Sequence, residues 1–139
     1  MSLSEIFKGF VMNRKGKGIN AERELIHFFW EKGWAAIRVA GSGATKYPSV
    51  DIVAGTPLRK LAIECKAIND TKKYFRKEEI DQLRQFSSKF GAEAWIAIRF
   101  NRVKWHFLSI EDLRETPEGA MVSQELATLK GLLFEEVIK

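Results

Sequence analysis

The sequence predicts one α/β domain, with a mixed five-stranded sheet flanked by helices. The chain has 139 residues, which is the usual size of a single domain. Two long segments place apolar residues at helical spacing, and five short apolar or alternating runs are typical of strands. The helix expected at 76–90 lies between the third and fourth strands and would join them as a parallel pair.

The N-terminal residues are treated apart from this domain. Residues 1–13 are interpreted as a flexible N-terminal extension or a cloning remnant, and residues 14–139 as the single domain. The stretch 13–18 reads Asn-Arg-Lys-Gly-Lys-Gly and is expected to be flexible and basic.

The first helix is expected to begin near Asn20, a plausible N-cap, and to end at Gly33. Leu25 and Phe29 lie on its apolar stripe, and Glu22 lies on the same stripe. An acid that faces a core is costly unless it has a partner. Glu22 is therefore the first candidate functional residue.

Five strands are expected, at 34–40, 50–54, 61–67, 94–98 and 103–107. The fourth is apolar throughout, as in a strand buried on both faces, and the fifth alternates like an antiparallel edge strand. In the third strand, alternation places Glu64 and Lys66 on one face and Cys65 on the other. Residues 69–77 are polar and indicate a loop, and short helices are expected within 109–113 and 125–139.

Composition narrows the functional class. Apolar residues make up 45% of the chain, which argues against disorder, and no apolar run reaches the roughly 18 residues of a membrane span. Cys65 is the single cysteine, so no internal disulfide is possible and a reducing, cytoplasmic setting is expected. The net charge of +5 favours polyanionic partners such as nucleic acid.

Two carboxylates are expected to meet on neighbouring strands. Asp51 lies in the second strand and Glu64 in the third, and a hairpin between these strands would bring the side chains together. Carboxylates at close range repel each other, and a bound Mg²⁺ relieves that repulsion because hard cations select oxygen ligands. Lys66 lies roughly 6–7 Å further along the same face, where an ammonium can orient an attacking water and offset charge on a phosphate.

Glu22 would add a third acid, placed to bind a second metal ion or to steer the attacking water. A plainer interpretation exists for each residue, because an aspartate at a strand start is often a turn residue and Glu-x-Lys is common by chance. The acids break apolar patterns in three separate segments, however, and that is where function is expected.

Six short motifs occur in one order along the chain: Lys15-Gly16, Ala21-Glu22-Arg23-Glu24-Leu25, Arg38-Val39-Ala40-Gly41-Ser42, Val50-Asp51-Ile52-Val53-Ala54, Ile63-Glu64-Cys65-Lys66 and residues 86–91. In order and spacing this set resembles the archaeal Holliday junction resolvase family, from about Asn13 to the C-terminus. The resemblance implies a type II restriction endonuclease-like fold. It also implies a homodimer that cuts four-way DNA junctions by paired, Mg²⁺-dependent nicks, with Mn²⁺ able to substitute.

The resemblance also implies roles for single residues. The metal ligands would be Asp51, Glu64 and the backbone carbonyl of Cys65, with Glu22 as a further candidate. The catalytic residues would be Glu22, Ser42, Asp51, Glu64 and Lys66. Ser42 would match a serine of a mobile loop that assists cleavage, and Arg23 and Arg38 would match positions that contact phosphates.

Further basic residues are expected to contact DNA, because carboxylates alone would repel it. These residues flank the acidic candidates along the chain: Arg14, Lys15, Lys17, Lys46, Lys72, Lys73 and Arg76. Solvated surface charge is the alternative for any one of them. The aromatic residues between Phe100 and Trp105 are candidates for the dimer surface.

Two rival functions stay open at this point. A nuclease of the same fold could act on duplex or flap DNA with the same residues, so the motif cannot exclude it. A non-catalytic DNA-binding module is the second rival, and the presence of all four polar candidates argues against it.

Overall fold

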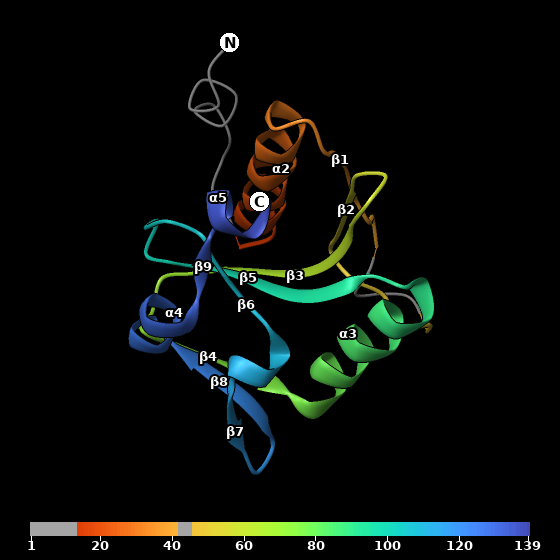
Figure 1. Cartoon of the computed structure of the whole chain (residues 1–139). Helices are drawn as coiled ribbons and strands as arrows, with labels where there is room; N and C mark the ends of the chain where they lie inside the picture. The colour runs from red at the N-terminus through yellow and green to blue at the C-terminus, as the bar shows by residue number, and fades with distance from the viewer. Residues whose placement is uncertain (1–13, 42–45) are drawn as a thin grey trace.

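The computed structural model describes residues 14–41 and 46–139 and has a central sheet with helices on both faces (Figure 1). The sheet has six strands in the order β1-β2-β3-β5-β6-β9. They are β1 (Ala35–Arg38), β2 (Ile52–Gly55), β3 (Lys60–Ile68), β5 (Glu93–Phe100), β6 (His106–Leu108) and β9 (Leu132–Leu133). Only β3 and β5 run parallel among these neighbours. The five expected strands are all present, and the two-residue β9 is added at the edge.

Helix α2 (Arg14–Glu31) covers one face of the sheet and helix α3 (Lys77–Phe90) covers the other (Figure 1). Each closes a core of its own, one around Leu25 and Phe29 and the other around Ile80 and Leu83. The sheet is therefore buried on both sides, which is why β5 is apolar throughout its centre. Within the described residues no helix is long and apolar enough to cross a membrane.

A second, three-stranded antiparallel sheet lies beside the first and has the order β4-β8-β7. Its strands are β4 (Lys72–Arg76), β7 (Arg114–Thr116) and β8 (Gly119–Ser123). The remaining elements are a 3-10 helix (Ile110–Asp112), α4 (Gln124–Lys130) and α5 (Phe134–Val137). Phe134 joins α5 to α2, because its ring packs edge-on against Phe29 with the centroids 5.0 Å apart.

The sequence-based start of the first helix is wrong. The helix begins at Arg14, so residues 14–18 of the stretch expected to be flexible are helical, and Asn20 is a buried residue inside the helix and not its N-cap. Each glycine in a helix interior costs about 1 kcal/mol, which is too little to prevent the first two turns from forming. The end of α3 at Gly91 is confirmed, because Gly91 has the left-handed φ of 75° that ends helices.

The loop expected at 69–77 is also wrong, because most of it forms β4. This strand pairs with β8, whose residues come more than forty positions later, so no local pattern announces the pairing. The fifth expected strand is shorter than predicted. Asn101 and Arg102 have positive φ angles of 52° and 60° and form a turn, so pairing of β6 with β5 begins only at His106.

Arg59, in the turn between β2 and β3, ties together parts of the chain that lie far apart in sequence. Its guanidinium donates to both carboxylate oxygens of Glu93 at 2.9 and 2.8 Å. It also donates to the carbonyl oxygens of Val137 and Lys139 at 2.9 and 3.1 Å, and lies 5.3 Å from the ring centroid of Trp34. One side chain therefore anchors the C-terminus to the central sheet.

The substitution Arg59→Ala is expected to lower the free energy of unfolding by about 1–3 kcal/mol, because it removes a bidentate ion pair and two hydrogen bonds to carbonyls. Chemical denaturation of the full-length chain measures this. Lys130→Ala, at an exposed position of α4, is the matched control and should leave stability unchanged. Equal stability of both variants would show that the C-terminal anchor contributes nothing.

Candidate active site

Asp51 directly precedes β2 and is held in place by hydrogen bonds to the residue after β1 and to β3. Its backbone N–H donates to the Ile63 carbonyl at 3.0 Å, and its carbonyl accepts from the Val39 N–H at 2.8 Å. Its side chain accepts a third bond, from the Cys65 N–H to Oδ2 at 2.8 Å. Because Ile52 pairs with Ile63, Asp51 is one register step further along, next to Glu64. The expected meeting of the two carboxylates is therefore confirmed.

The proximity of the two acids changes the protonation of Glu64. Burial and then the charge of Asp51 raise the pKa of Glu64 to about 8, against the smaller opposing effect of the Lys66 ammonium. Lys66 lies on the same face of β3, with Nζ 3.6 Å from Glu64 Oε2. The prediction that Glu64 and Lys66 share one face of the strand is confirmed. Without a further cation, the carboxylates of this cluster do not all ionise at neutral pH.

Glu22 reaches the same cluster from α2. Burial, followed by the charge of Asp51, raises the pKa of Glu22, while the bonded Arg38 and then Lys66 oppose the rise. The partner is Arg38 at the end of β1, whose Nε donates to Glu22 Oε2 at 2.9 Å. Arg38 is thus the partner that we expected for an acid on the apolar stripe of the helix. Arg38, expected to contact phosphate, lies within the cluster and orients Glu22.

Cys65 lies between Glu64 and Lys66 but turns to the opposite face of β3, where it packs against the core under α2. Burial raises the pKa of the Cys65 thiol well above its ordinary value, and the nearby negative charges of Asp51, Glu22 and Glu64 raise it further. A protonated, buried thiol is a poor nucleophile. The interpretation of Cys65 as a core residue is confirmed.

The donor set of this cluster fits a hard divalent cation. Among the described residues no three His, Cys, Asp or Glu side chains already converge as a metal cage. The pair of Asp51 and Glu64 nevertheless suits Mg²⁺, which keeps several waters and is commonly bound through one or two carboxylates. Burial and then the charge of Asp51 raise the pKa of Glu64, and a cation bound between the two carboxylates would offset both effects.

The basic candidates are dispersed around this cluster. Arg23 on α2, Lys46, and Lys72 and Arg76 on β4 are exposed, whereas Lys73 is half-buried with Nζ 6.0 Å from the Phe75 ring centroid. Arg14, Lys15 and Lys17 belong to the first turns of α2, and their side chains lie outside the described residues. Ser42 also lies outside the described residues, so its role stays a prediction.

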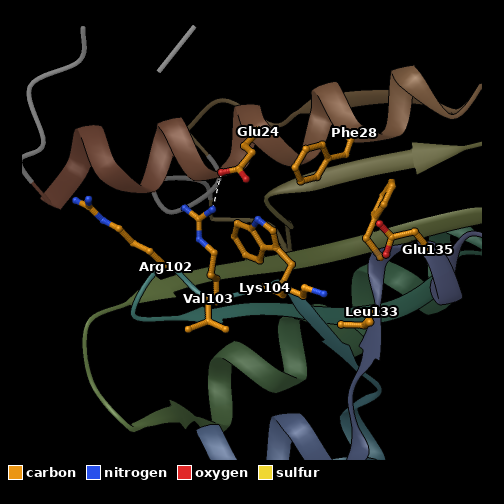
Figure 2. Close-up of a pocket in the computed structure, with 10 residues that line it drawn as sticks. Glu24, Phe28, Arg102, Val103, Lys104, Leu133 and Glu135 are labelled. Carbon is orange, nitrogen blue, oxygen red and sulfur yellow. Dashed lines mark hydrogen bonds and ion pairs between the residues drawn. The ribbon is translucent and has the colours of Figure 1, made fainter. Parts of the chain in front are cut away.

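One ion pair and one interaction between two acids were missed by the sequence reasoning. Glu24, on the side of α2 away from Glu22, accepts from Arg99 Nη1 at 2.6 Å, and Figure 2 shows this carboxylate pointing from the helix toward the sheet. The pair borders a pocket of about 460 Å³ that α2 shares with the turn after β5. Glu79, on α3, adds its charge to the causes that raise the pKa of Glu64. Both interactions join elements that lie far apart in sequence. The order of the strands in the sheet is the signal that could have indicated them.

Comparison with known proteins gives consistent matches. The sequence model of the family described as archaeal Holliday junction resolvase (Hjc) matches residues 12–139. The crossover junction endodeoxyribonuclease Hjc of Archaeoglobus fulgidus is 39% identical over 129 residues, covering 88% of this chain and 95% of that protein. The Hjc of Sulfolobus acidocaldarius is 32% identical, covering 92% of this chain and 90% of its own.

A solved structure supports the same relationship. The structure of Archaeoglobus fulgidus Hjc, a Holliday junction resolvase, matches with a TM-score of 0.80 and 40% sequence identity. It covers 85% of this chain and 95% of its own. The fold is therefore restriction endonuclease-like, as the sequence predicted.

The raised pKa of Glu64 predicts a pH-dependent stability in EDTA. Glu64 has an ordinary pKa of 4.5 when unfolded and about 8 when folded, so the folded chain retains a proton that the unfolded chain loses. Stability is therefore expected to fall as pH rises from about 4.5 to about 8. Glu64→Gln should remove this decline, and thermal unfolding across that range measures it. The control variant Glu78→Gln, at an exposed position of α3, should lose stability with rising pH as wild type does.

Proposed function

The chain belongs to the archaeal Holliday junction resolvase family, and we propose that Asp51, Glu64 and Lys66 form the centre with which it cuts four-way DNA junctions. It is a structure-selective endonuclease, by its match over nearly the whole length of the named resolvases. The observation that supports this site is the pair of carboxylates held side by side, with an ammonium 3.6 Å from one of them.

Each residue has a distinct task in hydrolysis of the phosphodiester. Lys66 can donate hydrogen bonds to the scissile phosphate or to the attacking water, and so offset the negative charge that develops in the transition state. Glu22, held by Arg38, can accept a hydrogen bond from that water and keep it in line with the phosphorus. Asp51 is itself fixed by the backbone of β3, so its other carboxylate oxygen has a defined position.

Divalent metal dependence is part of the proposal. Mg²⁺, for which Mn²⁺ can substitute, would be held by Asp51 and Glu64, with the Cys65 carbonyl or Glu22 as a further ligand. When bound, the cation would neutralise the carboxylates and polarise the phosphate. The requirement for it is supported by the excess of buried acid in the cluster.

The exposed bases support binding of branched DNA. Arg23, Lys46, Lys72 and Arg76 are exposed, so they can contact phosphates without reading sequence. Affinity for the junction should therefore fall steeply with salt. A cytoplasmic location stays a prediction from the single cysteine.

A homodimer is the assembly that paired cuts require, because one chain carries one such cluster. Phe100 and Trp105, expected at the dimer surface, are buried inside the protomer, so that prediction is wrong. The apolar side chains that remain exposed near one another are Trp30, Ile37 and Phe90, which border a groove of about 680 Å³. Exposed apolar surface of this kind is typical of an interface, and a second copy would cover it.

Asp51→Asn is expected to abolish junction cleavage while leaving junction binding intact, a loss of at least about 10³-fold in rate. Single-turnover cleavage of a synthetic four-way junction measures the rate, and gel-shift titration in EDTA measures binding. A linear duplex of the same sequence should be cut poorly. Asp81→Asn, on the exposed face of α3, is the control. Wild-type cleavage by Asp51→Asn, or cleavage without any divalent cation, would refute the assignment.

Phe90→Glu is expected to convert the dimer to monomers, because it places a charge in the apolar patch. Sedimentation at micromolar concentration measures the mass. Leu129→Glu removes an apolar side chain that is even more exposed, on α4 outside the patch, and should leave the dimer intact. Dimeric Phe90→Glu would place the interface elsewhere.

A further inference from the structure

Tyr74 is an exposed aromatic residue that the proposed mechanism does not use. It lies at the centre of β4, and 61% of its surface is exposed. Within the described part of the chain, its hydroxyl makes no hydrogen bond and its ring contacts no other aromatic ring or cation. A single exposed aromatic residue is ordinary on a protein surface, so the residues around Tyr74 decide whether it has a role.

The side chains of β4 are divided between the two faces of its sheet. Phe75 is buried in the core that α3 closes, and so is Val122 of the neighbouring β8. Strand alternation therefore turns Lys72, Tyr74 and Arg76 to the outer face, where all three are exposed. The result is an aromatic ring with a cation about 7 Å away on either side along the strand.

The two cations that flank the ring are available to an anionic partner. Lys72 makes no ion pair within residues 14–41 and 46–139. Arg76 is 77% exposed, and in the same ranges it makes one side-chain contact, from Nε to Glu79 at 3.3 Å. A third cation extends this face across the sheet, because Tyr74 is opposite Met121 of β8, and Met121 is opposite the exposed Arg114 of β7.

Hydrogen bonds hold β4 in place relative to the strand that carries Lys66. The turn between β3 and β4 accepts from Asn101, whose backbone N–H donates to the Ile68 carbonyl at 2.7 Å. The backbone N–H of Gln124 donates to the carbonyl of Thr71, directly before β4, at 2.9 Å. Tyr74 follows Lys66 by eight positions, so the chain keeps them within about 28 Å, less than the roughly 34 Å of one duplex turn.

An aromatic ring between two cations is the chemistry that recognises an unpaired nucleotide. Bases stack on aromatic side chains regardless of sequence, and adjacent cations contact the phosphates. Cations alone do not separate branched from linear DNA, because both carry the same phosphates. Inside a duplex each base is stacked between its neighbours, whereas a branch point interrupts that stacking and exposes the face of a base. Stacking on an exposed base therefore distinguishes the two kinds of DNA.

We propose that Tyr74 stacks on a base exposed at the branch point of the junction, while Lys72 and Arg76 hold the flanking phosphates. This contact contributes to the preference for branched over linear DNA. The inference rests on the proposed function, because it presupposes that the chain binds a four-way junction.

The test compares binding of a synthetic four-way junction and of a linear duplex of the same sequence, both in EDTA. Tyr74→Ala is expected to raise the junction Kd about tenfold, because base stacking is lost. The duplex Kd should stay within about twofold of wild type. Tyr74→Phe keeps the ring and should restore junction affinity. Fluorescence anisotropy measures both constants with the full-length protein.

Two further variants separate stacking from general effects. Leu58→Ala removes an apolar side chain that is 93% exposed, in the turn at the other end of β3, and should match wild type with both DNAs. Lys72→Ala should weaken both DNAs alike and lower the slope of log K against log salt by about one. If Tyr74→Ala also weakens both alike, leaves both unchanged, or is matched by Tyr74→Phe, the stacking role is wrong.

A fluorescent base at the branch point gives a readout that a merely structural role would not change. 2-Aminopurine placed there should fluoresce more in the complex with Tyr74→Ala than in the complex with wild type, because an aromatic ring stacked on it quenches its emission. Equal emission in the two complexes would contradict the inference.

The wild-type constants tell which claim has failed. A preference of wild type for the junction that survives in Tyr74→Ala would refute the inference alone. Equal affinity of wild type for junction and duplex, together with equal cleavage of both, would refute the proposed function and the inference with it.

Discussion

The hydrogen bond from the Cys65 N–H to Asp51 Oδ2 is the contact on which the rest of the site depends. It closes the register between β2 and β3 with a side chain in place of a backbone carbonyl, and it thereby fixes Asp51 beside Glu64. One oxygen of Asp51 is used in this structural bond, so the other has a defined direction. Every later feature, from the raised pKa of Glu64 to the reach of Lys66, follows from that register.

The cluster is a site where the fold accepts an electrostatic cost. Several elements bring negative charge to one point, and among the described residues Arg38 and Lys66 counter it there. The fold tolerates this repulsion because α2 packs on one face of the sheet and α3 on the other. The strands therefore cannot separate to relieve the repulsion. A rigid, over-acidic pocket is what a cation-dependent hydrolase needs, since charge neutralisation then coincides with binding of the metal.

The exposed basic and apolar residues bear on the two contacts that we propose, with DNA and with a second copy of the chain. The second sheet carries β4, whose exposed Lys72 and Arg76 follow the end of β3 in the chain, so these bases and Glu64 belong to one connected segment. The edge of the central sheet at β1 and the end of α3 carry two of the exposed apolar residues, Ile37 and Phe90. The DNA contacts proposed for β4 and the dimer contacts proposed for β1 and α3 thus come from different elements of one domain.

The sequence alone determined the α/β class, the parallel connection through α3, and the common face of Glu64 and Lys66. These follow from periodicity, which is a local property of the chain. It could not determine β4, since its pairing with β8 spans more than forty residues, nor the pairing of Glu22 with Arg38. Those contacts join separate elements, and only the packed sheet fixes their distances, because a charge interacts with whatever the fold places beside it and not with its neighbours in sequence.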